Sequence, residues 1–193
     1  MVYLTFDDGP IPEVTPKVLE ILDRYQVKAT FFMVGENIDK HPDIFRMVLD
    51  AGHAVGNHTY NHLKGIRTSS SEYLSNVQKW EDAWGRGVSS SSPFRGTEGV
   101  LDLFRPPYGK AWFWQRRAIK RRGYRLIYWD VLTRDYDRTR TPEAMLAQIK
   151  RCTRPGSIIN FHDSLKSNER MLAVLPLAIE WLLAQGYELK CIN

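Results

Sequence analysis

Strand-like and helix-like segments alternate along almost the whole length of this 193-residue chain. The strand-like segments are short apolar runs rich in β-branched and aromatic residues, and segments with apolar residues at helical spacing separate most of them. Because strands that alternate with helices pair in parallel, the pattern predicts an α/β fold, with a closed or distorted barrel favoured over an open doubly wound sheet. We expect a single domain over residues 1–193. The expected strands are residues 2–6, 28–34, 54–57, 101–105, 124–129, 157–161 and 187–191.

The expected helices begin at recognisable capping signals. A proline follows Thr15, His41 and Thr141, which places it in the first helical turn, where proline is tolerated. Ser69 and Glu72 have the spacing of a capping box. The serine- and glycine-rich segment at 85–100 has no periodicity and is expected to form a surface loop. Helices are therefore expected over about 15–25, 42–51, 70–84, 112–122, 142–152 and 170–184.

Composition narrows the class of protein. With 43% hydrophobic and 25% charged residues, the chain can form a sizeable core and is not expected to be disordered. It has no apolar run of membrane-spanning length and no charged leader ahead of an apolar stretch, so we expect a cytoplasmic protein, or an extracytoplasmic one if a leader has been removed. Cys152 and Cys191 lack metal-ligand spacing and are expected to be free thiols. The oligomeric state is left open.

Basic residues are concentrated in one expected helix. This cluster is either a contact surface for an acidic polymer or the solvated face of the helix, and the second interpretation is favoured because charged helix faces are usually solvated. Its members are Arg116, Arg117, Lys120, Arg121 and Arg122.

Two adjacent carboxylates, Asp7 and Asp8, directly follow the first expected strand. Like charges this close raise each other's pKa, so their adjacency indicates a cation, a reaction, or simply a solvated turn. A cation bound by one aspartate would cancel the repulsion and leave the other free to act as a base. Gly9 and Pro10 end the strand there, which lets both side chains reach one site.

His58 and His62 form a second candidate cluster. Their i, i+4 spacing would place both imidazoles on one face of a helical turn, whereas His53 is expected to point to the other face and be structural. Two imidazoles and one carboxylate leave positions for water and substrate, as a catalytic zinc site requires. The same donors form the iron(II) facial triad of oxygenases, but the additional carboxylate favours hydrolysis.

The candidate residues share one position relative to the expected strands, because each follows a strand at its C-terminal end. In parallel α/β folds these ends meet at one edge, which is where active sites assemble. The residues are Asp7, Asp8, His58, His62, the segment 105–108, Asp135 after the fifth strand, and His162 after the sixth.

Five motifs, TFDDGP, HTYNH, RPPYG, RDY and FHD, occur in this order over residues 5–163. Together they resemble the motifs of the polysaccharide deacetylases, the NodB-homology or carbohydrate esterase family four. The resemblance implies a distorted (β/α)7 barrel. It also implies a metal-dependent hydrolase that removes N-acetyl groups from amino sugars in an oligo- or polysaccharide such as chitin or peptidoglycan. The expected partner is an N-acetylated glycan, and nucleic acid is not expected.

The resemblance also implies the metal ligands and the base. Asp8, His58 and His62 would hold a divalent cation, with zinc expected and Co²⁺, Ni²⁺ or Mn²⁺ as alternatives. Asp7 would be the general base, and Arg105 would pair with it and keep it ionised.

The remaining implied roles concern the oxyanion and the leaving group. The backbone N–H of Tyr108 would help to stabilise the oxyanion. His162 would protonate the departing amine as the general acid, and Asp135 would orient this histidine and raise its pKa.

Three positions depart from the family pattern. Leu132 stands where an aspartate is frequent, Tyr136 replaces a groove tryptophan, and Asn160 replaces a leucine that lines the pocket for the acetyl methyl group. Tyr108 and Tyr136 are expected to contact the sugar. Strand alternation puts Asn160 on the same face as His162, where a polar side chain would weaken an apolar acyl pocket by about 1 kcal/mol. The acyl group removed is therefore left open.

A non-catalytic module that binds glycan or nucleic acid on the same fold is the remaining alternative. In such a module the arginine-rich helix would be the contact surface. Every catalytic position carries the required residue type, which favours an enzyme.

Overall fold

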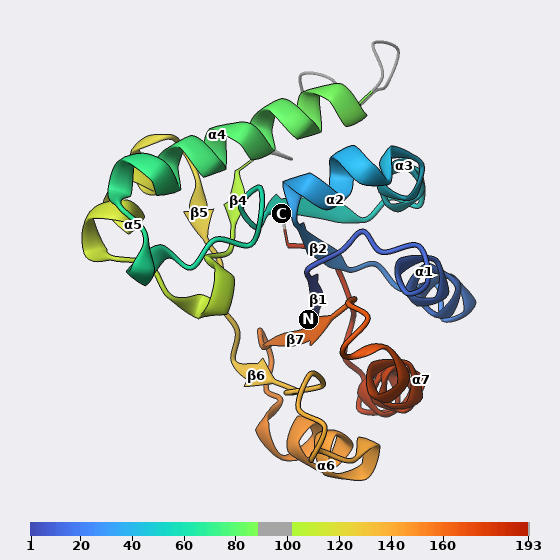
Figure 1. Cartoon of the computed structure of the whole chain (residues 1–193). Coiled ribbons are helices and arrows are strands. Elements are labelled where there is room, and N and C mark those ends of the chain that lie inside the picture. The colour runs from blue at the N-terminus through green and yellow to red at the C-terminus, as the bar shows by residue number, and fades with distance from the viewer. Residues whose placement is uncertain (89–101, 193) are drawn as a thin grey trace.

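The computed structural model describes residues 1–88 and 102–192, and its centre is a curled parallel sheet of seven strands. The helices lie around the outside of this sheet (Figure 1). The strand order is β5-β4-β3-β2-β1-β7-β6, so β2 is the middle strand, β1 lies between β2 and β7, and β5 and β6 lie at the two edges. This confirms the expected α/β fold of the distorted (β/α)7 barrel type. The strands are β1 (Tyr3–Asp7), β2 (Thr30–Met33), β3 (Ala54–Asn57), β4 (Leu103–Phe104), β5 (Arg125–Leu126), β6 (Val131–Leu132) and β7 (Ile158–His162).

The helices begin where the capping signals indicate. The Ser69 hydroxyl accepts a hydrogen bond from the backbone N–H of Glu72, and Thr141 caps its helix in the same way. Two short 3₁₀ turns, η1 (Gly65–Arg67) and η2 (Pro107–Gly109), lie between longer elements. The α-helices are α1 (Thr15–Arg24), α2 (Gly35–Lys40), α3 (Pro42–Asp50), α4 (Ser70–Gly87), α5 (Phe113–Arg121), α6 (Pro142–Cys152) and α7 (Asn168–Ala184).

The structure differs from the sequence-based expectation in several elements. The strand expected at 187–191 is wrong, because this segment contributes only an isolated bridge between Val2 and Leu189. The seventh strand is β6 instead, which is too short to produce a periodic pattern. The expected loop at 85–100 begins inside α4, and its residues 89–100, together with residue 101 of the expected fourth strand, lie outside the described residues.

Phe6 anchors the centre of the sheet. Its ring stacks on Phe31 of β2 and on Phe161 of β7, with centroid distances of 5.0 and 5.7 Å, and all three rings are fully buried. Burying one such side chain stabilises the fold by about 1.5–3 kcal/mol. The same register pairs Asp7 with His162 across β1 and β7, so packing on one face of the sheet places two polar residues side by side on the other.

Two expectations from composition can be compared with the structure. Cys152 and Cys191 are both free thiols, as expected. Within residues 1–88 and 102–192, no helix has the length and apolar character needed to cross a bilayer.

Candidate active site

A cleft of about 430 Å³ opens at the C-terminal ends of the central strands. Most of the candidate residues line it, which agrees with the expectation that they meet at one edge of the sheet. Asp135 follows β6 and not the fifth expected strand, but it still reaches the same edge. The residues that line the cleft are Asp7, Asp8, His58, His62, Tyr108, Trp129, Leu132, Tyr136, His162, Ser164 and Lys166.

Asp8, His58 and His62 form a group that can hold a metal ion, with one donor atom from each residue within 4.8 Å of the others. The Nε2 atoms of His58 and His62 lie 3.8 and 3.3 Å from Oδ1 of Asp8. That buried oxygen has no hydrogen-bond partner within the described residues. Nδ1 of His58 lies 2.7 Å from the carbonyl oxygen of Arg105, which orients the ring. Burial lowers the pKa of His58 to about 4, so its imidazole is neutral and able to bind a cation. This donor set fits a divalent metal.

The two histidines reach this arrangement without a helix, so the expected helical turn is wrong. The segment after β3 is irregular, and Thr59 and His62 have left-handed backbone with φ of 64° and 56°. The backbone N–H of Thr59 donates to Oδ1 of Asn57, and Asn76 of α4 accepts hydrogen bonds from the next two backbone N–H groups. Side-chain hydrogen bonds therefore take the place of a helical ladder in this segment.

Asp7 is buried at the end of β1 and has a partner for each carboxylate oxygen. Oδ1 accepts a hydrogen bond from Nη1 of Arg105 at 2.7 Å, and Oδ2 accepts one from Nδ2 of Asn160 at 3.1 Å. Arg105 is also fully buried, with its guanidinium 4.0 Å from the ring centroid of Phe32. Burial raises the pKa of Asp7, but the charge and hydrogen bond of Arg105, together with the charge of His162, outweigh burial and hold the pKa below its usual range. The carboxylate is therefore ionised and fixed in orientation.

Asn160 lies beneath Asp7 and does not line the cleft. Its side chain is fully buried, and Oδ1 accepts hydrogen bonds from Thr5 at 3.0 Å and Arg105 at 2.5 Å. It does share the face of His162, as expected, but it is two residues further from the end of β7. The expectation that Asn160 lines an acyl pocket is therefore wrong, because this side chain supports the carboxylate of Asp7 from below.

His162 is held by Asp135 through two hydrogen bonds. Oδ1 of Asp135 lies 2.8 Å from Nδ1 of the ring, and Oδ2 accepts from the backbone N–H of His162 at 2.7 Å. Burial lowers the pKa of His162, but the hydrogen bond and charge of Asp135 outweigh burial and raise it to about 9. The imidazole is therefore protonated near neutral pH, which is the form that a general acid needs.

Asp163 fixes the turn after β1 and was not predicted as a site residue. It accepts hydrogen bonds from the backbone N–H of Gly9 at 3.0 Å and from the Thr15 hydroxyl at 2.6 Å. A Cβ atom at Gly9 would lie 2.1 Å from Oδ2 of Asp163, so only glycine fits there. Burial raises the pKa of Asp163 to about 8, although the Thr15 hydrogen bond lowers it. The FHD motif contained this residue and was the signal available in the sequence.

Aromatic side chains form part of the cleft wall. The Tyr108 ring is 54% exposed and lies 4.7 Å from the ring of His62, and Tyr136 meets His162 edge-on at 5.1 Å. Trp129 and Lys166 also line the cleft and were missed. Trp129 ended an expected strand and could have been found by its position, whereas no pattern in the sequence points to Lys166.

The sequence is similar to those of polysaccharide deacetylases. The sequence profile of the family described as polysaccharide deacetylase matches residues 1–127. A chitooligosaccharide deacetylase of Azorhizobium caulinodans is 36% identical, and the match covers 98% of this chain and 91% of that protein. A peptidoglycan-N-acetylglucosamine deacetylase of Bacillus cereus is 34% identical over 84% of this chain, and the match spans 56% of the relative's length.

A solved structure shows the same fold. The crystal structure of the Bc1960 peptidoglycan N-acetylglucosamine deacetylase superposes with a TM-score of 0.90. The two chains are 30% identical, and the superposition covers 99% of this chain and 85% of the other.

Proposed function

The chain belongs to the polysaccharide deacetylase family, and on that premise we propose that it hydrolyses the N-acetyl group of N-acetylglucosamine-type residues in a chitooligosaccharide or peptidoglycan strand. One observation supports this proposal above all. The buried, arginine-paired carboxylate of Asp7 lies beside the metal-binding group formed by Asp8, His58 and His62, and it is paired in register with His162 on the next strand. A base, a cation site and an acid in one cleft are the groups that amide hydrolysis needs.

Asp8, His58 and His62 would hold the cation, for which we propose zinc. Two neutral imidazoles and one carboxylate leave room for water and substrate, as in catalytic zinc sites. When bound, the ion would supply Lewis-acid polarisation of the scissile amide and of the attacking water.

Asp7 accepts the proton of the attacking water in this proposal. Its lowered pKa keeps it ionised, and the hydrogen bonds from Arg105 and Asn160 aim the carboxylate into the cleft. An oxygenase would have no use for such a base, which argues against the iron(II) alternative.

His162 gives its proton to the departing amine. Asp135 holds the imidazole by Nδ1, so the proton at the other ring nitrogen is the one available for transfer. The backbone N–H of Tyr108 is the proposed donor to the developing oxyanion. The Tyr108 and Tyr136 rings would contact the sugar, and Trp129 and Leu132 offer the apolar surface for the acetyl methyl group.

Acetate release tests this function. The assay compares native, chelated and zinc-reconstituted protein with Asp7→Asn on chitooligosaccharides and on lysozyme-digested peptidoglycan. Asp7→Asn is expected to lower kcat by about 10²–10⁴-fold, whereas Asp50→Asn, an exposed position at the end of α3, serves as the control with native activity. Acetate release that survives both chelation and Asp7→Asn would overturn the proposal.

A further inference from the structure

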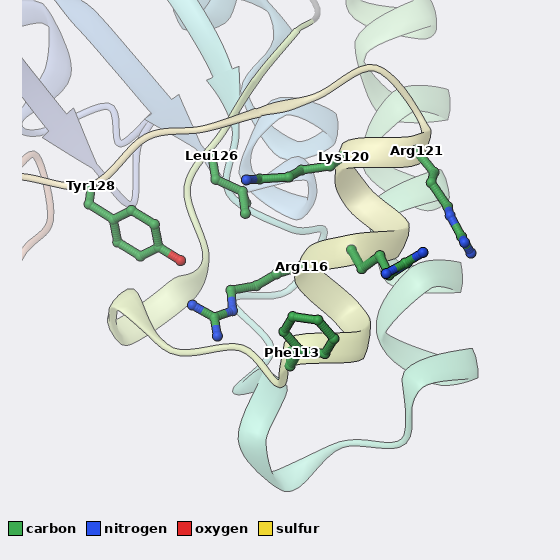
Figure 2. A pocket seen from close by; sticks show the side chains of 7 residues that line it. Phe113, Arg116, Lys120, Arg121, Leu126 and Tyr128 are labelled. Atoms are coloured by element: carbon green, nitrogen blue, oxygen red, sulfur yellow. The ribbon is translucent and has the colours of Figure 1, made fainter.

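A second cavity, of about 650 Å³, lies beside α5 and is lined by cations and aromatic rings. Figure 2 shows Arg116 extending toward Tyr128 and Lys120 extending toward Leu126, with Phe113 at the start of the helix. The cationic residues that line the cavity are Arg116, Arg117, Lys120 and Arg121. They include four of the five residues of the basic cluster seen in the sequence, so this face of the helix forms one wall of a cavity.

The four cations have no acidic partner within the described residues. Within that part of the chain, every ion pair between an arginine or lysine and an acidic side chain is formed by a basic residue outside this group of four. Like charges four residues apart on a helix repel each other and destabilise it. The helix dipole favours Lys120 and Arg121 in the last turn, but it does not account for Arg116 and Arg117 in the middle of α5. An anion in the cavity would relieve this repulsion.

The cavity adjoins the active-site cleft. Tyr128 lines the cavity, and the next residue, Trp129, lines the cleft. The backbone between the cavity and the cleft is held by Arg105, whose Nη2 donates to the carbonyl oxygen of Tyr128 at 3.1 Å. Exposed rings continue along η2 and the start of α5, where Tyr108 is 54% and Phe113 is 56% exposed. Consecutive residues after β5 therefore line the cavity and the cleft.

We propose that this cavity binds carboxylate groups of the same glycan strand that the cleft deacetylates, which makes an acidic glycan a better substrate than a neutral one. The inference rests on the proposed function. Guanidinium groups match a carboxylate with two parallel hydrogen bonds, and the faces of Tyr128 and Phe113 suit the apolar face of a sugar ring. The phosphates of a nucleic acid would also pair with the cationic side chains of the cavity, but a nucleic acid offers no N-acetyl group to the adjoining cleft.

The test compares three substrates: peptidoglycan strands with free carboxylates, the same strands after amidation of those carboxylates, and chitohexaose. The variant is Arg116→Gln/Arg117→Gln, and the matched control is Lys150→Gln/Arg151→Gln, which removes the same charge from the exposed end of α6. For the first variant we expect KM for the acidic strand to rise about tenfold, kcat to stay constant, and both neutral substrates to be unaffected. Added salt should raise KM of the wild type for the acidic strand alone.

A KM change that is equal for all three substrates, equal in the control variant, or absent overturns the inference. If the wild type releases no acetate from any substrate, the proposed function fails, and calorimetric binding of the free and amidated strands still tests the cavity. Tighter binding of the free strand that is lost in Arg116→Gln/Arg117→Gln supports it. Tighter binding of an oligothymidylate than of the acidic strand, lost in the same variant, overturns it in favour of a nucleic-acid site.

Discussion

Replacing Asn160 by leucine tests the support beneath the base. The substitution removes a hydrogen bond to Asp7 and the bonds accepted from Arg105 and Thr5, all within a fully buried site. Hydrogen bonds to charged groups contribute about 1.5–3 kcal/mol each, so losing two of them is expected to lower the free energy of unfolding by about 3 kcal/mol or more. The Arg105–Asp7 ion pair remains. A misaimed base then lowers kcat by about 10–100-fold, which corresponds to about 1.4–2.7 kcal/mol in the barrier.

The assay combines urea unfolding with the rates of release of acetyl, propionyl and butyryl groups from N-acylated chitooligosaccharides. The acyl preference is expected to stay the same, because Asn160 does not line the cleft. Asn160→Asp keeps the acceptor for Arg105 but places a second carboxylate against Asp7, so it should lower kcat further. Unchanged stability of Asn160→Leu together with a new acyl preference would refute the reasoning and return Asn160 to the acyl pocket.

Three further substitutions test other contacts described above. Asp135→Asn removes the largest of the interactions that raise the pKa of His162 to about 9, so the alkaline limb of kcat/KM should move to lower pH. An unmoved limb contradicts the assignment of the general acid. Burial lowers the pKa of His53 from 6.5 to about 4, so the unfolded chain takes up the proton at a higher pH than the folded chain does. The free energy of unfolding therefore falls as the pH drops from 6.5 to 4, and the loss reaches about 2 kcal/mol at pH 5. His53→Gln should lose less stability between pH 7.5 and 5 in urea titrations, and an equal loss would show that other groups cause it. Gly9→Ala should lower the free energy of unfolding by about 1–3 kcal/mol, because its Cβ would lie 2.1 Å from Oδ2 of Asp163. An unchanged free energy of unfolding would mean that the turn can shift.

The sequence predicted which residues gather in the site because each follows a strand, and parallel strands share one polarity. The sequence did not predict how far each side chain lies from the strand end that forms the cleft. Alternation along β7 correctly places Asn160 on the face of His162, but it does not reveal that Arg105 and Asp7 already cover the position two residues further from the strand end.

The prediction of a helical turn after β3 was wrong for a different reason. The spacing of His58 and His62 is helical, but hydrogen bonds from Asn57 and Asn76 hold a left-handed backbone that a periodicity rule does not detect. The strand β6 has two residues and is held by non-local contacts, namely its pairing with β7 and a hydrogen bond from Gln148 of α6 to the Leu132 carbonyl, so it shows no local pattern.

Zinc binding and acetate release measured on the same samples test the central claim most directly. Wild-type protein and Asp8→Ala are freed of metal by chelation, titrated with zinc, and assayed for acetate release at each step. The account predicts that the wild type binds about one equivalent of zinc and regains activity in proportion, while Asp8→Ala does neither. Full acetate release by the metal-free wild type, or unchanged zinc affinity and activity in Asp8→Ala, would contradict it.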